Sequence, residues 1–297
     1  MPVDENDKSA GETELISQVQ GGKLKVDNLF NVDGWVAVAT LAENGARVYI
    51  SGRRGEVLKK AAELGKPTSG KGEIIPVEAD CSTKDGIQKL VKAVSAKEKQ
   101  LNVLINNHGV SMPKPNINVE QTPEALSKEM FENEEMDRFL QTYQINTASY
   151  YFTAWAFLPL LSASKEPWGE PGSILNIASM SGITYTSQKG QFNYNASKAA
   201  TISLTNQLAC EFARRDLGVR VNSINPGYFP SGMTKFTTDS SDASEREYFR
   251  KTMGTPLARA GQATDHAQAV LAAVCNRFMT GCNLVVDGGW LLEQSLD

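Results

Sequence analysis

Short apolar runs alternate along the chain with segments of helical periodicity. Four of the runs indicate strands, and they lie at 46–51, 172–179, 219–225 and 283–286. The apolar stretch 147–161 and the Ala-rich segment 196–204 indicate helices. Because strands alternate with helices, the pattern predicts an α/β fold with a doubly wound, mostly parallel sheet in three layers.

The alternation continues to residue 289 without a linker rich in Pro, Gly or Ser, so we predict a single domain over residues 23–297. Residues 1–22 are polar and rich in Asp, Glu, Ser and Gly, which predicts a disordered tail. No charged n-region with an apolar segment follows Met1, and 147–161 is too short and too hydroxylated to span a bilayer. We therefore expect a cytoplasmic protein without a membrane partner.

Charge and cysteine usage narrow the possible functions. The net charge is −4 and no basic run occurs, which argues against a nucleic-acid partner. The cysteines (Cys81, Cys210, Cys275 and Cys282) are scattered without a CxxC pair, so reduced thiols are favoured over disulfides or zinc. The two histidines, His108 and His266, are too far apart for an HExxH metal motif, and no metal site is predicted.

The most informative chemistry lies in Tyr194 and Lys198, which are four residues apart. On a helix they share one face, and a nearby ammonium lowers the pKa of a phenol, which is otherwise near 10. Tyr185 and Lys189 have the same spacing, but their surroundings are rich in Gly, Ser and Thr and indicate a loop. We therefore favour Tyr194, which opens the Ala-rich helix.

Ser179 ends the predicted strand 172–179, and the carboxyl ends of parallel strands are where α/β sheets bind ligands. With Asn146 and Tyr194-Asn195-Ala196-Ser197-Lys198, three further motifs complete a pattern: Asn106-Asn107-His108-Gly109, Pro226-Gly227 and Val286-Asp287-Gly288-Gly289. Over roughly residues 27–292 this pattern resembles the short-chain dehydrogenase/reductase family. Segment 227–234 is similar to its branch of 3-oxoacyl-thioester reductases related to rhamnolipid synthesis.

The resemblance implies a Rossmann-like fold and an NADP(H)-dependent oxidoreductase that reduces a carbonyl, either a ketone or a 3-oxoacyl group, to an alcohol. Tyr194 then donates the proton, and Lys198 lowers the pKa of the phenol and holds the nicotinamide ribose. Ser179 hydrogen-bonds the carbonyl oxygen, and Asn146 supports a proton-relay water. The resemblance also implies a homodimer or homotetramer. The polar, Ser/Thr-rich segment 228–252 is expected to cover the carbonyl substrate as a lid.

The loop after the second strand indicates which cofactor binds. An acidic residue there holds the ribose of NAD, whereas Arg accommodates the 2′-phosphate of NADP. Gly52 stands in the acidic position and Arg53 and Arg54 follow, which favours NADP; a pair of solvated surface arginines is the alternative. By resemblance, the other cofactor contacts are Asp80 at the adenine, Asn106 and Asn107 at the adenosine ribose, and Pro226, Phe229 and Ser231 at the nicotinamide end.

One part of the family pattern is missing from the sequence. Residues 35–44 contain no glycine, whereas the family carries TGxxxGxG in this region to approach the pyrophosphate. Residues 35–38 are either the first strand or a surviving helix, and the eight residues 39–46 are too few for an ordinary helical crossover to 47–51. We therefore predict an internal deletion of about one phosphate-loop length.

Such a deletion would truncate the first strand, and loss of that strand would expose two inner sheet edges or bring a segment such as 23–30 into the gap. Cofactor binding would then be weak. Two hypotheses stay open: an NADP(H)-dependent reductase that is impaired in this chain, and an inactive pseudoenzyme or truncated gene product that acts as a protein-interaction scaffold.

Overall fold

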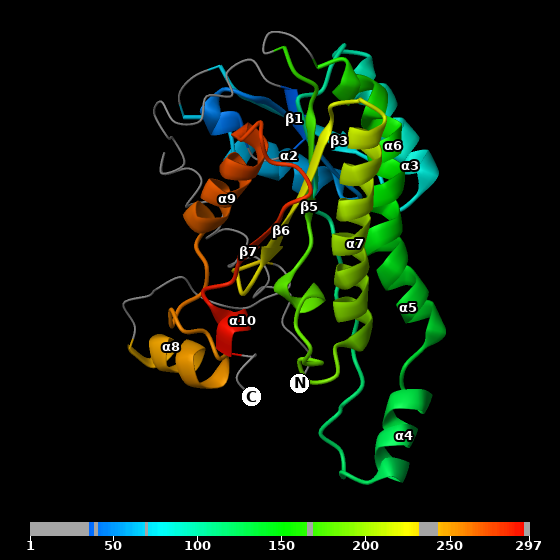
Figure 1. The fold of residues 1–297 in the computed structure, drawn as a ribbon, viewed down its shortest axis with the longest axis vertical. Helices are drawn as coiled ribbons and strands as arrows, with labels where there is room; N and C mark the ends of the chain where they lie inside the picture. The colour runs from blue at the N-terminus through cyan, green and yellow to red at the C-terminus, as the bar shows by residue number, and fades with distance from the viewer. Residues whose placement is uncertain (1–35, 39–40, 69–70, 165–168, 232–242, 294–297) are drawn as a thin grey trace.

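The computed structural model describes residues 36–38, 41–68, 71–164, 169–231 and 243–293 (Figure 1). Within them, seven parallel strands form one sheet in the order β3-β2-β1-β4-β5-β6-β7. The strands are β1 (Val36–Val38), β2 (Arg47–Gly52), β3 (Glu73–Glu78), β4 (Val103–Asn106), β5 (Ser173–Ile177), β6 (Arg220–Pro226) and β7 (Asn283–Val286). The order reverses at β1, which confirms the doubly wound, Rossmann-like fold. The predicted tail 1–22 lies outside the described residues.

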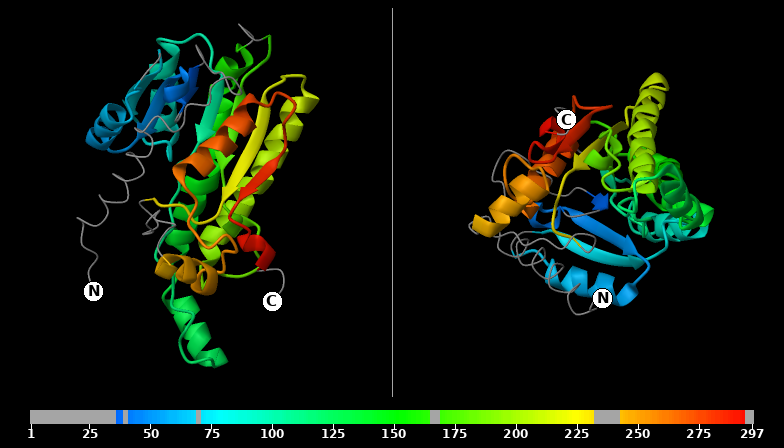
Figure 2. Two further views of the ribbon diagram at one scale, coloured as in Figure 1. Left: turned by 90° about the vertical axis from the view of Figure 1, so that its left-hand side faces the viewer. Right: turned by 90° about the horizontal axis from the view of Figure 1, so that it is seen from below.

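Helices cover both faces of this sheet, which gives the three predicted layers (Figures 1 and 2). One face carries α3 (Lys84–Ser95), α6 (Ser149–Ser162) and α7 (Phe192–Arg214), and the other carries α2 (Gly55–Leu64) and α9 (Ala263–Cys275). The remaining helical segments are η2 (Ala42–Asn44), α4 (Pro123–Glu132), α5 (Met136–Tyr143), η3 (Gln144–Ala148), η4 (Met180–Gly182), α8 (Ala243–Glu247), η5 (Tyr248–Thr252) and α10 (Trp290–Glu293). Helix α4 extends away from the sheet (Figure 1).

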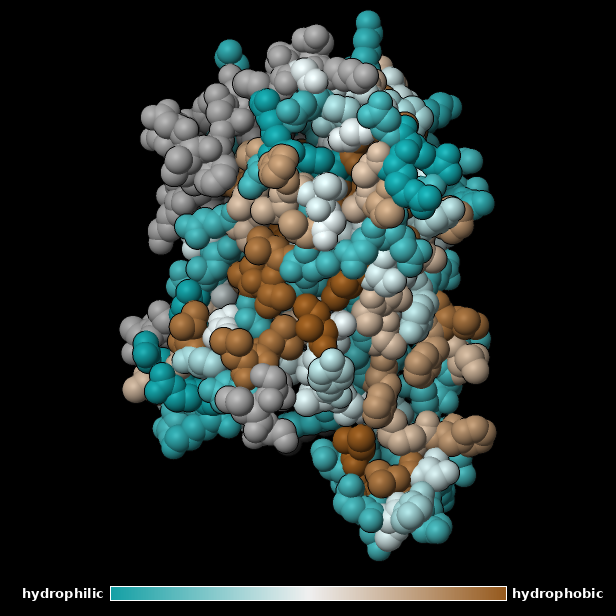
Figure 3. Space-filling view, in the orientation of Figure 1, coloured by the Kyte–Doolittle hydropathy of each residue, from teal (hydrophilic) through white to brown (hydrophobic). Residues whose placement is uncertain are grey.

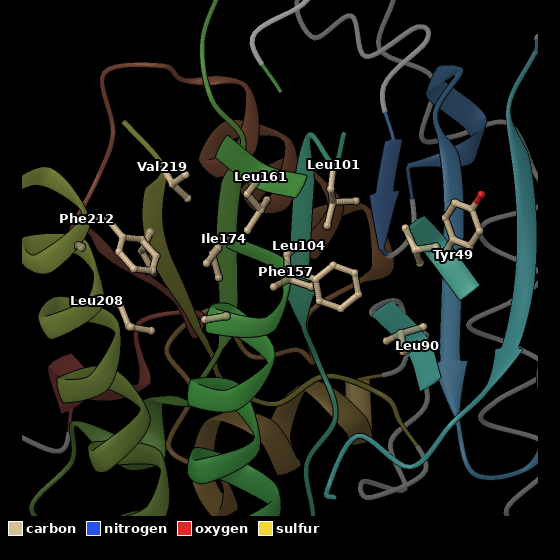
Figure 4. Packing of buried hydrophobic residues seen from close by; sticks show 14 of the residues in the cluster. Tyr49, Leu90, Leu101, Leu104, Phe157, Leu161, Ile174, Leu208, Phe212 and Val219 are labelled. Carbon is tan, nitrogen blue, oxygen red and sulfur yellow. The ribbon is translucent and has the colours of Figure 1, made fainter. Parts of the chain in front are cut away.

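The hydrophobic core has two parts, one on each face of the sheet. On the α6–α7 face, Phe157 of α6, Phe212 of α7 and Leu104 of β4 belong to one buried cluster, in which Phe157 lies beside Leu104 (Figure 4). On the other face, Val270 and Val274 of α9 pack on strand residues such as Ile224. β4 and β5 are buried along their whole length, as expected for central strands covered on both sides.

The first strand is present, which corrects the expectation of an open gap in the sheet. Val36–Val38 forms β1 and pairs with both β2 and β4, so these two strands are bridged. The connection needs no α-helix because Val36 pairs with Arg47, the first residue of β2, so the chain has only a short distance to return. Its described part contains the single 3-10 turn Ala42–Asn44, followed by Gly45 at a φ of 90°.

Arg220 joins β6 to the end of α9. Its guanidinium donates to the carbonyls of Val274 at 2.7 Å and Asn276 at 3.0 Å, and also reaches Ala273 and Met279. The Ala273 and Val274 carbonyls belong to the last turn of α9, where carbonyls lack intrahelical partners, and the Asn276 and Met279 carbonyls follow the helix. One side chain therefore hydrogen-bonds several carbonyls at the C-terminal end of α9.

Replacing Arg220 with Met is expected to lower the free energy of unfolding by about 2–3 kcal/mol, because several carbonyls lose a charged donor at once. Urea denaturation would measure the change. Arg215→Met is the matched control, since Arg215 forms only an exposed pair with Glu211 and should change stability by less than about 1 kcal/mol. Equal losses in the two variants would contradict the role assigned to Arg220.

Candidate active site

Ser179 and Tyr194 meet at the carboxyl end of the sheet. Ser179 lies two residues beyond β5 and caps η4, where its Oγ accepts a hydrogen bond from Ser181 N at 3.1 Å. Tyr194 lies in the first turn of α7, and a side-chain hydrogen bond joins it to Ser179. Both residues are 8% exposed. Tyr185 instead lies fully exposed on the loop before α7, as the sequence predicts.

The pKa of Tyr194 is raised, whereas the sequence led us to expect a lowered value. Burial raises the pKa of the phenol, and the hydrogen bond with Ser179 opposes that shift. Lys198 Nζ lies 5.8 Å from the centroid of the Tyr194 ring, above the ring rather than in contact with the hydroxyl. The upward shift of the Tyr194 pKa could not be predicted from the sequence, because desolvation depends on tertiary packing. Tyr194 is therefore protonated at neutral pH, the form that can donate a proton.

Lys198 is an ammonium buried beneath the site. It is 4% exposed, and Nζ donates to the carbonyl of Ile177 at 2.9 Å, at the end of β5. Burial lowers the pKa of Lys198 to about 8, so the side chain is mostly cationic at pH 7. A Cβ placed on Gly109 would lie 3.4 Å from Nζ, so the glycine leaves room for the ammonium.

Asn146 lies in the π-helical turn η3 and connects the helices to the loop after β4. Its side chain accepts from Val110 N at 2.8 Å and donates to Val110 O at 2.9 Å and Ser197 Oγ at 3.0 Å. Its carbonyl accepts from Thr201 Oγ1 at 2.8 Å. π-Turns often occur at functional sites, and this one fixes Asn146 beside α7.

Ser197 and Thr201 were missed by the sequence reasoning. Both are fully buried and hydrogen-bond Asn146 from α7. Their spacing in the sequence could have identified them, because Ser197 and Thr201 lie three and seven residues after Tyr194 and therefore share its helical face.

A pocket opens at the carboxyl ends of β2, β3 and β4. It is lined by Ser51, Gly52, Arg53, Ala79, Asp80, Cys81, Ser82, His108, Gly109, Val110 and Ile145. Asp80 accepts from Ser82 N at 3.0 Å and Ser82 Oγ at 2.6 Å, and these bonds, together with the charge of Arg53, lower the pKa of its carboxyl. The structure thus brings together Arg53 and Asp80, two of the residues predicted at the adenosine end.

Three other predicted cofactor residues do not line this pocket. Arg54 is exposed and stands at the N-cap of α2. Asn106 is buried and donates from Nδ2 to Asn176 Oδ1 at 2.9 Å, which ties β4 to β5. Asn107 follows it with an exposed side chain.

The predicted nicotinamide-end residues follow β6. Pro226 is the last residue of that strand, Phe229 packs edge-on against His266 at 5.6 Å between centroids, and Ser231 is half-buried. Phe229 lines a second pocket with Tyr228 and residues of the loop before α9. Residues 232–242, most of the predicted lid, lie outside the described residues.

His108 is a neutral packing residue in the wall of the first pocket. Its Nε2 lies 2.6 Å from Ser149 Oγ, and its ring packs edge-on against Tyr150 at 4.9 Å. Burial, with the positive charge of Lys198, lowers the pKa of His108 to about 4. His108 therefore carries no charge at neutral pH.

The residues present fit the two ends of a dinucleotide better than its middle. Arg53 and Asp80 can face the adenosine end, and Tyr194 and Lys198 can face a nicotinamide ribose. Between β1 and β2, however, residues 39–46 contain a single glycine, Gly45. It lies at the start of β2 rather than at the carboxyl end of β1. The backbone amides of a glycine-rich turn are therefore not available there to the pyrophosphate.

The described residues contain no group of three His, Cys, Asp or Glu side chains that could hold a metal ion. None of their helices combines the length and hydropathy of a membrane span.

Comparison with known proteins agrees with this architecture. A family model described as enoyl-(acyl carrier protein) reductase matches residues 34–291. The short-chain dehydrogenase/reductase PhomF of Diaporthe leptostromiformis is 34% identical over 288 residues, covering 89% of this chain and 94% of that protein. The rhamnolipids biosynthesis 3-oxoacyl-(acyl-carrier-protein) reductase of Pseudomonas aeruginosa is 30% identical over 263 residues, covering 87% and 92%.

The fold also matches a solved structure, the Pseudomonas aeruginosa RhlG/NADP active-site complex, with a TM-score of 0.72 and 26% identity over 89% of this chain and 99% of that one. Fold, site and relatives together define an oxidoreductase of the Rossmann type. The chain belongs to the short-chain dehydrogenase/reductase family, whose members bind NAD(P).

Proposed function

We propose that this protein is an NADP(H)-dependent reductase that converts a ketone or 3-oxoacyl group to an alcohol. The observation that carries the proposal is the buried Tyr194 phenol, hydrogen-bonded to Ser179 with the Lys198 ammonium beneath it. A nicotinamide bound beside them would supply the hydride. The named relatives, among them a 3-oxoacyl reductase, support the substrate class.

Each side chain then has one task. Ser179 hydrogen-bonds the substrate carbonyl oxygen, and Tyr194 gives its phenolic proton to that oxygen as negative charge develops there. The positive charge of Lys198 stabilises the phenolate that is left behind. Asn146 holds the loop after β4 against α7 and so supports the path by which a proton returns.

The test of the proposal is NADPH oxidation, followed by absorbance, with a panel of ketones, 3-oxoacyl thioesters and small polar sugars. The proposal expects turnover with apolar carbonyls, because Tyr228 and Phe229 present an aromatic wall. Activity only on the sugars would contradict the substrate class. Activity on none of the compounds would contradict the proposed reaction.

Arg53 is proposed to select NADP over NAD, supported by its place in the pocket with Asp80. Arg53→Asp is expected to weaken NADPH binding about tenfold or more, since a charged contact to the 2′-phosphate is replaced by repulsion. NADH binding should change much less. Calorimetry with both nucleotides measures the two changes, and Arg54→Asp serves as the control because Arg54 does not line the pocket. A larger loss with Arg54→Asp would reassign the phosphate contact.

The lack of a glycine-rich turn between β1 and β2 favours a second candidate function. If too little binding energy remains without the pyrophosphate contact, the chain acts as a non-catalytic family member and binds protein partners. A cooperatively melting protein that binds neither NADPH nor NADH would select this candidate.

We further propose a homodimer or homotetramer in the cytoplasm. Exposed apolar side chains support the assembly: Met136 and Leu140 of α5, and Tyr151 and Phe152 of α6. Figure 3 shows a second hydrophobic surface between α7 and α9, over the edge strand β7, where Val285 is exposed. The free thiols of all four cysteines support a reducing compartment.

Sedimentation at micromolar concentration should therefore give a dimer or tetramer. Replacing both Tyr151 and Phe152 with Glu is expected to shift the distribution to smaller species, because the apolar face of α6 becomes charged. A folded wild-type monomer under these conditions would contradict the assembly.

A further inference from the structure

Two lysines that are far apart in sequence lie together near the candidate active site. Lys114 belongs to the segment between β4 and α4, and Lys189 belongs to the loop between η4 and α7. Lys114 Nζ donates to the carbonyl of Gln188 at 2.8 Å, so the ammonium rests on the backbone directly before Lys189. This loop also connects Ser179 to Tyr194.

The backbone that holds the lysines together is strained. Gln188 has a φ of 49° and Lys189 a φ of 64°, followed by Gly190 at 90°. Residues other than glycine rarely adopt this left-handed backbone region, and each one that does lowers stability by on the order of 1 kcal/mol. A Cβ on Gly190 would lie 3.3 Å from the carbonyl of Pro115, so the loop is pressed against the chain next to Lys114.

Both lysines are exposed to solvent, and their like charges repel each other. Partial desolvation lowers the pKa of Lys114, and the neighbouring charge of Lys189 lowers it further. Among the described residues, no carboxylate forms an ion pair with either ammonium. Lys114 uses one of its three donors on Gln188 and keeps two. Two like charges in a chain of net charge −4 are thus held together.

Both lysines belong to segments that lead to or from residues of the candidate active site. Lys189 is five residues before Tyr194, and Lys114 is five residues after Gly109, which lies against Lys198. Five extended residues span at most about 18 Å, which is an upper bound on each of the two Cα separations.

We propose that Lys114 and Lys189 bind an anionic group of the substrate, a carboxylate or a phosphate, so that the carbonyl compound reduced at Tyr194 is an acid. The reduction itself rests on the proposed function, whereas the anion site stands on the lysine geometry alone. The strained loop then places one ammonium on each side of the anion. Lys128 of α4 is exposed and forms no such pair, which makes Lys128→Met a matched control.

Anion binding is tested first without turnover. Melting curves of the full chain are recorded with inorganic phosphate and with 5-oxohexanoate, each against sodium chloride of equal ionic strength. At about ten times the dissociation constant, at least one anion should raise Tm by about 3 °C in the wild type and in Lys128→Met. The anion that acts distinguishes a phosphate from a carboxylate.

The double variant Lys114→Met/Lys189→Met should lose this rise. No rise with either anion in the wild type, or an undiminished rise in the double variant, would overturn the anion site.

Turnover gives the second readout. The wild type should prefer 5-oxohexanoate over its methyl ester by about tenfold in kcat/KM, through a lower KM, and the double variant should lose that preference. An equal preference in both proteins would overturn the substrate assignment. If no carbonyl is reduced at all, the proposed reaction fails, and the melting curves still decide the anion site.

Discussion

Replacing Tyr194 with Phe is expected to abolish carbonyl reduction while the protein keeps its fold. The substitution removes only the hydroxyl, and the remaining ring keeps its buried position in the first turn of α7. Proton transfer by a placed side chain contributes about 10²–10⁴-fold to rate, so kcat should fall by that factor. Steady-state kinetics measures the loss, and thermal melting reports whether the fold persists.

The matched control is Tyr185→Phe, which removes the same hydroxyl from the competing Tyr-x-x-x-Lys pair. Tyr185 is fully exposed on the loop before α7, so its substitution should leave kcat and Tm unchanged. Comparable losses of activity in the two variants would show that the proton donor has been misassigned.

Lys198→Met is expected to abolish activity and to stabilise the protein. Activity is lost because no positive charge remains to stabilise the Tyr194 phenolate. Stability rises because burial lowers the pKa of Lys198 to about 8, so its ionisation at neutral pH costs folding free energy. Removing that cost should raise the free energy of unfolding by about 2–3 kcal/mol at pH 7, less the lost bond to Ile177 O.

The pH dependence separates this effect from ordinary repacking. Between the folded pKa of about 8 and the unfolded value of 10.5, the unfolded chain binds more protons at this lysine than the folded chain. Wild-type stability should therefore gain a contribution as pH rises through this window, and the Met variant should lack it. Urea denaturation at pH 7 and pH 10 measures both proteins. A Met variant that is less stable than wild type at both values would contradict a destabilising buried ammonium.

Local rules predicted the placement of most residues of the candidate site. Tyr194 and Lys198 share a helix face because they are four residues apart, and Ser179 follows β5 because the apolar run ends there. The elevated pKa of Tyr194 could not be predicted in the same way. It depends on desolvation by elements that are distant in sequence.

The other differences between prediction and structure come from pairing between strands that are distant in sequence. Asn106 lies opposite Asn176 only because β4 and β5 pair in that register, and their amide contact cannot be read from either strand alone. The first residue of β1, Val36, pairs with the first residue of β2, Arg47. Because of this register, a connection whose described part contains a single 3-10 turn can take the place of a helix. The length of the connection between β1 and β2 excluded an ordinary helix there, but it did not exclude a strand at 36–38.

We propose that the two ends of an NADP(H) site remain in a chain whose β1–β2 connection lacks a glycine-rich turn. Calorimetric titration of the purified chain with NADPH decides whether they suffice for binding. We predict saturable binding with a dissociation constant of about 0.1–1 mM, weaker than a site with a full pyrophosphate contact would give. Binding at about 1 µM or tighter would contradict the weakened contact. The absence of binding to a protein that melts cooperatively would contradict the NADP(H)-dependent reaction itself.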